Sequence, residues 1–242
     1  MNILYSVTDS NYLGLTAGLI RSLSEHEPGF EKLAIGVMGL GEAEARFLRG
    51  LDSRVELMEL ASPDESEILH DEGWVSRTLQ KTIGLREMLR LGHRVIMLDA
   101  DCIVLRPILL ELEGVAGVGV CRRERPAVRK DIRLDYIASL FVGYGEKALG
   151  FVDLWILIQK KLIEAKIQPP FETPALCRAI RYCEPSLIED IDESVFSRQN
   201  SFAQDTRIAH LKSNSIEKTS DVLKSRLNCL NVADRNLLAR YY

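Results

Sequence analysis

The strongest constraint on the fold is an alternation of short apolar runs with longer helical stretches through the first half of the chain. Most of the apolar runs contain almost no polar residue, as buried strands do; they are Ile3–Val7, Leu33–Met38, Val55–Leu60, Val95–Leu98 and Val118–Val120. The stretches between them repeat apolar residues three and four positions apart, as helices do; they are Tyr12–Ser24, Gly41–Leu51 and Val75–Leu91. Because strands without a polar face are covered on both sides, the pattern predicts an α/β fold with an open, mostly parallel sheet flanked by helices.

The second half of the chain is less regular. The charged, turn-prone segment Arg122–Arg133 predicts a mobile loop or a junction between lobes. Beyond it we expect an apolar run, a long helix and a short helix that begins near Thr173-Pro174; the first two are Ile137–Val142 and Glu146 to about Lys166. We therefore expect a single domain over residues 1–242, made of halves 1–125 and 126–215 and a C-terminal helical tail at 216–242.

Composition excludes several classes of protein. The 242 residues include 35 acidic and 31 basic side chains, and the net charge of −4 offers no basic surface for a nucleic acid. No apolar run reaches the ~18 residues of a membrane-spanning helix, and the N-terminus has no signal-peptide pattern. We expect a cytoplasmic protein with no transmembrane segment and no nucleic-acid partner. The cysteines form no CxxC pair and are expected to be buried free thiols; they are Cys102, Cys121, Cys177, Cys183 and Cys229.

Two carboxylates one residue apart follow the fourth apolar run. Asp99 and Asp101 flank the small Ala100 where the chain is expected to turn, so both side chains can reach one hard divalent cation, which prefers oxygen ligands. Ligands of such sheets gather at the carboxyl ends of the strands, which favours a metal-binding role for this pair. Solvation of the strand end, or capping of a helix, is the alternative.

The loop after the first strand offers polar groups that can hydrogen-bond a nucleotide base and a ring that can stack on it. The candidates are Thr8, Asp9, Asn11 and Tyr12. Asp9 or Ser10 equally suits the N-cap of the following helix, and one role does not exclude the other.

Three further residues are candidates for the same site. Arg77 and Lys81 lie on the helix before the Asp pair and can contact a phosphate or a sugar, although ordinary solvated charge explains them as well. His210 ends another short apolar run and is either a structural residue or a ligand of the same metal ion.

Together these motifs resemble the GT-A nucleotide-diphospho-sugar glycosyltransferases, within them the family 8-like group of glycogenin and the lipopolysaccharide galactosyltransferases. The resemblance spans roughly residues 2–214, and the DxD of Asp99 and Asp101 is its sharpest part. The segment 139–155 is similar to a strand and helix of the family, and 171–176 to its acceptor-side motif.

The resemblance implies a Rossmann-like GT-A fold with a smaller acceptor-side lobe, in which residues 1–125 bind the nucleotide sugar and 126–215 face the acceptor. It implies a UDP-sugar donor, a carbohydrate, lipid or protein acceptor, and Mn²⁺ or Mg²⁺ held by Asp99, Asp101 and His210. It further implies a catalytic role for Glu172, and nucleotide contacts from Lys212 and from Asp99 itself.

Two other functions fit parts of the sequence. A strand ending in Asp-x-Asp also begins the haloacid-dehalogenase phosphatases, in which Asp99 would be phosphorylated and Asp101 would act as the general acid. Against this, several strand–helix units precede the motif, and only Glu189-Asp190 represents the later acidic pair. The remaining alternative is a sugar-nucleotide-binding protein that does not catalyse a reaction.

Overall fold

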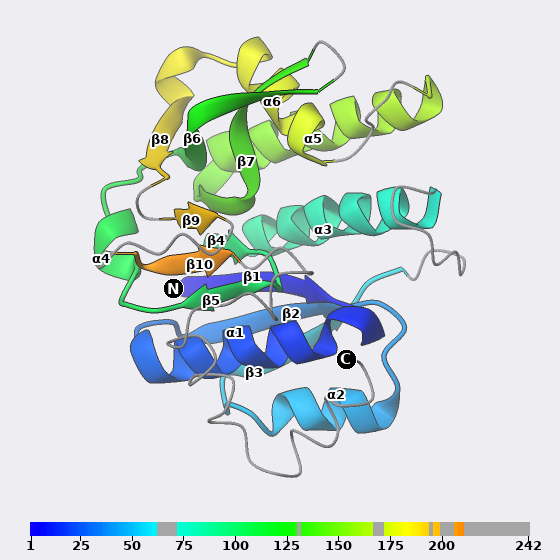
Figure 1. Cartoon of the computed structure of the whole chain (residues 1–242), viewed down its shortest axis with the longest axis vertical. Coiled ribbons are helices and arrows are strands. Elements are labelled where there is room, and N and C mark those ends of the chain that lie inside the picture. The colour runs from blue at the N-terminus through cyan, green and yellow to red at the C-terminus, as the bar shows by residue number, and fades with distance from the viewer. Residues whose placement is uncertain (62–71, 130–131, 167–171, 194–195, 199–205, 211–242) are drawn as a thin grey trace.

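A seven-stranded open sheet forms the centre of the molecule (Figure 1). The computed structural model describes residues 1–61, 72–129, 132–166, 172–193, 196–198 and 206–210. Four strands run parallel, in the spatial order β3 (Val55–Glu59), β2 (Lys32–Val37), β1 (Asn2–Thr8) and β4 (Arg94–Leu98). The sheet continues through β7 (Ile132–Gly143) and β6 (Val118–Arg129), each antiparallel to the strand before it, and ends with β8 (Ile188–Asp192), parallel to β6.

Helices cover both faces of this sheet, as the apolar strands require. One face packs against α1 (Leu13–His26) and α2 (Glu42–Arg49), and the other against α3 (Glu72–Arg90), α5 (Gly145–Glu164) and α6 (Glu172–Tyr182) (Figure 1). Alternate residues of one strand therefore enter different cores: on β4, Ile96 and Leu98 pack toward α1, whereas Val95 and Met97 pack toward α3 and α5.

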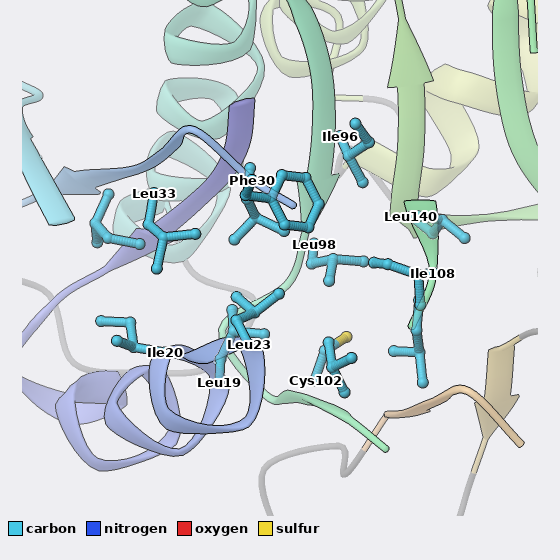
Figure 2. Close-up of a cluster of buried hydrophobic side chains, with 14 of the residues drawn as sticks. Leu19, Ile20, Leu23, Phe30, Leu33, Ile96, Leu98, Cys102, Ile108 and Leu140 are labelled. Atoms are coloured by element: carbon cyan, nitrogen blue, oxygen red, sulfur yellow. The ribbon is translucent and has the colours of Figure 1, made fainter. Parts of the chain in front are cut away.

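The core on the α1 side holds the end of β4 and the segment after it in place. Figure 2 shows Leu19, Ile20 and Leu23 of α1 gathered with Leu98, Cys102 and other apolar side chains of this cluster. All five of these residues have no exposed surface. The turn that carries the Asp pair is thus anchored by buried side chains on both sides of it, at Leu98 and at Cys102.

A second, three-stranded sheet lies beside the carboxyl end of β4. It consists of β5 (Cys102–Val104), β10 (Ile208–His210) and β9 (Phe196–Arg198), with β10 antiparallel to β5 and parallel to β9. Sequence analysis did not predict this sheet. The short elements that complete the described fold are the 3₁₀ helices at Ser10–Tyr12 and Pro185–Leu187 and the helix α4 (Leu109–Leu112).

The prediction for Arg122–Arg133 was wrong. Apart from residues 130 and 131, which lie outside the described residues, this segment forms the two strands of a hairpin made by β6 and β7. Three of its charged side chains have partners: Arg122 pairs with Asp190 on β8, Arg133 pairs with Asp135, and the buried Arg123 donates to the Tyr136 carbonyl. A polar segment can therefore form strands when exposed charges pair next to the backbone ladder.

The α/β prediction is confirmed, and the first five predicted strands are all present. The thiols of Cys102, Cys121 and Cys177 are buried and unpaired, and burial raises the pKa of each, so they are neutral near pH 7. Cys183 is a free thiol that is partly exposed, and Cys229 lies outside the described residues. No helix in the described part of the chain has the length and apolar character needed to span a membrane.

Candidate functional site

The Asp pair lies in a tight turn between the two sheets. β4 ends at Leu98, and the Cys102 amide then donates to the Asp99 carbonyl at 3.0 Å, which closes the turn before β5. The Asp99 amide also donates to the Ser139 carbonyl of β7 at 3.1 Å. Both ends of the turn are therefore fixed to the sheets, and the two carboxylates project from a rigid segment at the carboxyl edge of the central sheet.

The small sheet brings His210 to the same place. β10 pairs with β5 so that His210 lies opposite Cys102, the residue after Asp101. His210 Nε2 lies 3.1 Å from Asp101 Oδ1, and one ligand atom each from Asp99, Asp101 and His210 lies within 4.8 Å of the others. The cluster is largely buried, and two carboxylates with one imidazole are a donor set that fits a divalent ion.

A buried lysine connects this cluster to α6. Lys81 Nζ lies 2.6 Å from Asp99 Oδ1, 3.4 Å from Glu172 Oε1 and 3.3 Å from the Ala138 carbonyl. Burial by itself lowers the pKa of this ammonium, but the charges of Asp99 and Glu172 outweigh burial, and the pKa of Lys81 is raised. Lys81 therefore stays charged and holds the carboxylates of Asp99 and Glu172 on either side of it.

The loop after β1 is built from short polar contacts. Asp9 caps the 3₁₀ helix through Oδ1, which accepts from the Tyr12 amide at 3.1 Å, while its Oδ2 lies 3.5 Å from Arg77 Nε on α3. The Thr8 hydroxyl accepts from Thr16 at 2.8 Å. Asp9 therefore has the capping role considered as an alternative, and it also links the loop to α3. Of the two remaining candidates, Asn11 is exposed and Tyr12 is half-buried.

These candidates converge because of the strand order. β1 and β4 are parallel neighbours, so the loop after β1 and the Asp pair after β4 meet at the same edge of the sheet. Arg77 and Lys81, four residues apart on α3, face this edge, since each contacts a residue there. Glu172, the first residue of α6, contacts Lys81 from the other side. Lys212 lies outside the described residues.

Sequence reasoning missed the groups that hold this site together. The Ala138 carbonyl, the Trp155 indole and the Gln159 amide all contact the site residues or the helices that carry them. A backbone carbonyl leaves no signal in the sequence. Gln159, however, is a polar residue at an apolar position of its helix, and that departure from the pattern was visible.

An open sheet with helices on both faces, an Asp-x-Asp turn at its carboxyl edge and a small second sheet beside it define the GT-A fold. Among solved structures, the galactosyltransferase LgtC in complex with donor and acceptor sugar analogues matches with a TM-score of 0.65 and 12% identity, over 98% of this chain and 100% of LgtC. An active-site mutant of LgtC matches equally well. The apo structure of the bifunctional glycosyltransferase WbbM matches with a TM-score of 0.66 and 11% identity, over 98% of this chain and 51% of WbbM.

At such low identity the likeness shows that the fold is shared, and the expected GT-A fold is confirmed. No protein-family model matches the chain, and no curated protein matches it by sequence.

Proposed function

We propose that this chain is a metal-dependent glycosyltransferase that moves a sugar from a UDP-sugar to a carbohydrate, lipid or protein acceptor. The observation that carries the proposal is the cluster of Asp99, Asp101 and His210 at the carboxyl edge of a GT-A sheet. The fold supports the class of reaction, because the matching LgtC structure holds donor and acceptor sugar analogues.

In this proposal the three clustered side chains hold Mn²⁺ or Mg²⁺. The bound ion supplies neutralisation of the charge that develops on the diphosphate as the glycosidic bond breaks. Asp101 comes from the turn just before β5, and His210 comes from β10, which pairs with β5. The pairing of these two strands therefore fixes the two donors relative to each other.

The nucleotide is proposed to lie along the edge between the loop after β1 and α3. Thr8, Asp9, Asn11 and Tyr12 contact the base, and Asp99 contributes beside the diphosphate. Arg77 and Lys81 supply positive charge there, and Lys212 does so from outside the described residues. The ion pair of Asp9 with Arg77 supports this proposal, because it joins the loop after β1 to a cationic side chain of α3.

Glu172 is proposed as the catalytic carboxylate. It lies against the Lys81 ammonium, which in turn contacts Asp99, so a single lysine connects its carboxylate to the proposed metal site. Its Oε2 atom is buried and accepts no hydrogen bond from the described residues. A fixed carboxylate in this place is suited to stabilise positive charge on a sugar ring as the leaving group departs.

The phosphatase alternative receives no support from the strand order. The second acidic pair that it requires, Glu189-Asp190, lies on β8, and β7 and β6 separate β8 from β4. Asp190 pairs there with Arg122 and Tyr136, and Glu189 accepts from the amides of Ala116 and Gly117. Both acids therefore already have ion-pair or hydrogen-bond partners around β6 and β8.

Thermal stability with nucleotides tests the proposal together with a transfer assay. UDP with Mn²⁺ at a hundredfold excess over its Kd is expected to stabilise the protein by about 2.7 kcal/mol, and UDP without metal by much less. ADP or GDP binding as tightly as UDP would contradict the uridine preference. Incubation with UDP-sugars should release UDP and glycosylate an acceptor; release of inorganic phosphate would instead favour the phosphatase. Binding with no transfer to any acceptor would favour the non-catalytic alternative.

A further inference from the structure

Helix α5 carries a buried polar residue in an otherwise apolar stripe. All of α5 is described, and its buried positions are Ala148, Phe151, Val152, Trp155, Ile156, Gln159 and Leu162. Gln159 has no exposed surface. Its Nε2 donates to Thr78 Oγ1 at 2.9 Å, and its Oε1 lies 3.3 Å from Thr82 Oγ1. The amide thus spans one turn of the facing helix α3.

The two threonines do not require Gln159 for their own hydrogen bonding. The Thr78 hydroxyl donates to the Val75 carbonyl at 2.8 Å, and the Thr82 hydroxyl lies 2.9 Å from the Leu79 carbonyl. An apolar side chain at position 159 would therefore leave neither hydroxyl without a partner, and it would avoid the desolvation of a buried amide. What the amide adds is a directional contact that fixes α5 relative to α3.

Trp155, one turn earlier on the same face of α5, makes the corresponding contact with α6. Its Nε1 donates to the Glu172 carbonyl at 2.9 Å, and its ring is fully buried. Residues four apart lie on one face of a helix, so a single face of α5 holds both neighbouring helices. The contact with α6 is made at its first residue, Glu172.

The two helices fixed by these contacts, α3 and α6, carry the ion pair between Lys81 and Glu172. Lys81 lies between Thr78 and Thr82 on α3, and its backbone carbonyl also accepts from the Tyr5 hydroxyl at 3.2 Å. Its Nζ lies 3.4 Å from Glu172 Oε1. Any shift of α3 against α6 changes this separation, and α5 contacts both helices through directional hydrogen bonds.

We propose that Trp155 and Gln159 are positioning residues that set the separation between Lys81 and Glu172. Neither touches the proposed ligands, and the effect on catalysis rests on the function proposed above. Trp155 acts on a backbone carbonyl of α6, and Gln159 acts on two hydroxyl groups of α3.

Three variants separate positioning from packing. Trp155→Phe keeps an aromatic ring and removes the indole donor, and Gln159→Met keeps the length of the side chain and removes the amide. Leu162→Ala is the matched control, because Leu162 is a buried residue of the same stripe with an apolar side chain. It should lower the melting temperature at least as much as either test variant.

The first readout is the ammonium signal of Lys81 in ¹⁵N-lysine-labelled protein, assigned by its loss in Lys81→Arg. Burial against two carboxylates should give wild-type Lys81 a slowly exchanging signal. Trp155→Phe and Gln159→Met should shift it and speed its exchange, and Leu162→Ala should leave it in place. An unchanged signal in both test variants would overturn the inference, whatever the activity.

The second readout is steady-state transfer. A misplacement of about 1 Å in a catalytic group lowers rates by up to about a hundredfold, so kcat should fall by roughly ten- to a hundredfold in both test variants, with KM for the donor little changed. If the loss of kcat is proportional to the loss of melting temperature across all three variants, the inference is overturned. If the wild-type protein transfers no sugar, the proposed function fails, and the Lys81 signal alone decides the positioning role.

Discussion

Asp99 lies between two groups of site residues, and its contacts with both determine the charge balance of the site. On one side it accepts from the buried Lys81 ammonium, and on the other it faces Asp101 and His210. Three carboxylates, including Glu172, thus lie near one lysine and one histidine. The site has an excess of buried negative charge that a divalent cation would relieve.

Replacement of Lys81 tests this balance. Lys81→Met leaves the partly buried carboxylates of Asp99 and Glu172 without their shared cation, and the free energy of unfolding should fall by about 3 kcal/mol, as measured by urea denaturation. Mn²⁺ should restore part of the loss. Lys32→Met is the control, because Lys32 pairs with the exposed Glu56 and should change stability by less than about 1 kcal/mol. Equal losses in the two variants would argue against a buried charge cluster.

Replacement of Asp101 tests the metal site itself. Asp101→Ala should abolish the Mn²⁺-dependent part of UDP binding in a calorimetric titration, since it removes one of the three donors. The far-ultraviolet circular dichroism of the metal-free protein should change little, because the turn is held by backbone hydrogen bonds. Asp190→Asn, which removes a carboxylate on β8, should bind UDP and Mn²⁺ normally. Metal-dependent binding that persists in Asp101→Ala would contradict the assignment.

A third residue gives a prediction for pH, away from the site. The Arg54 guanidinium and the Ser24 hydroxyl lower the pKa of Asp52 to about 2 from its ordinary 3.8. The folded state thus favours the ionised carboxylate of Asp52. Its contribution to the free energy of unfolding is fully present above about pH 4 and is lost as the pH falls toward 2. Asp52→Asn should therefore cost about 1 kcal/mol in thermal unfolding at pH 6 and much less at pH 2.5. Glu42→Gln, at an exposed pair with Arg46, should have little effect at either pH.

At the scale of elements, the sequence predicts best where local periodicity and burial agree. The strand before Asp99 was recognised because all of its central residues are apolar, and α1, α2, α3 and α5 followed from their helical spacing. The hairpin of β6 and β7 was missed because its strands are joined by a backbone ladder between distant residues, which the charged composition of one segment does not reveal.

The second sheet was missed for a related reason. Its strands have three residues each, too few to show a period of two, and their partners lie far apart in the chain. His210 could therefore be selected as a candidate only by its residue type and its place after an apolar run. Its distance from Asp101 follows from the pairing of β10 with β5, which sequence alone does not specify.

The contact between α3 and β1 gives a prediction at this scale. A Cβ atom added at Gly84 would overlap the hydroxyl of the fully buried Tyr5, so Gly84→Ala must displace either the Tyr5 ring or α3. We expect a loss of about 2 kcal/mol in the free energy of unfolding by urea. Gly150→Ala is the control on α5: nothing lies within 4 Å of its added Cβ, and it should be neutral or stabilising. Combining Gly84→Ala with Tyr5→Phe should recover part of the loss.

At the scale of the whole molecule, the sheet order explains why one edge holds all of the site. Parallel neighbours β1 and β4 place their loops together, and the antiparallel β7 beside β4 supplies the carbonyls of Ala138 and Ser139. The sequence predicted the class of this sheet from its covered strands. It did not predict the antiparallel half, because direction depends on the connections between strands and not on their composition.

The pairing of β5 with β10 also has a consequence for the order in which the protein is made. Synthesis proceeds from the N-terminus, so Asp99 and Asp101 leave the ribosome well before His210 does. Six of the seven strands of the main sheet are complete in the nascent chain before β8, and all seven are complete before β10. A growing chain therefore carries the acid pair without the imidazole, and the three-donor cluster assembles only at a late stage, once the strand that closes it has emerged.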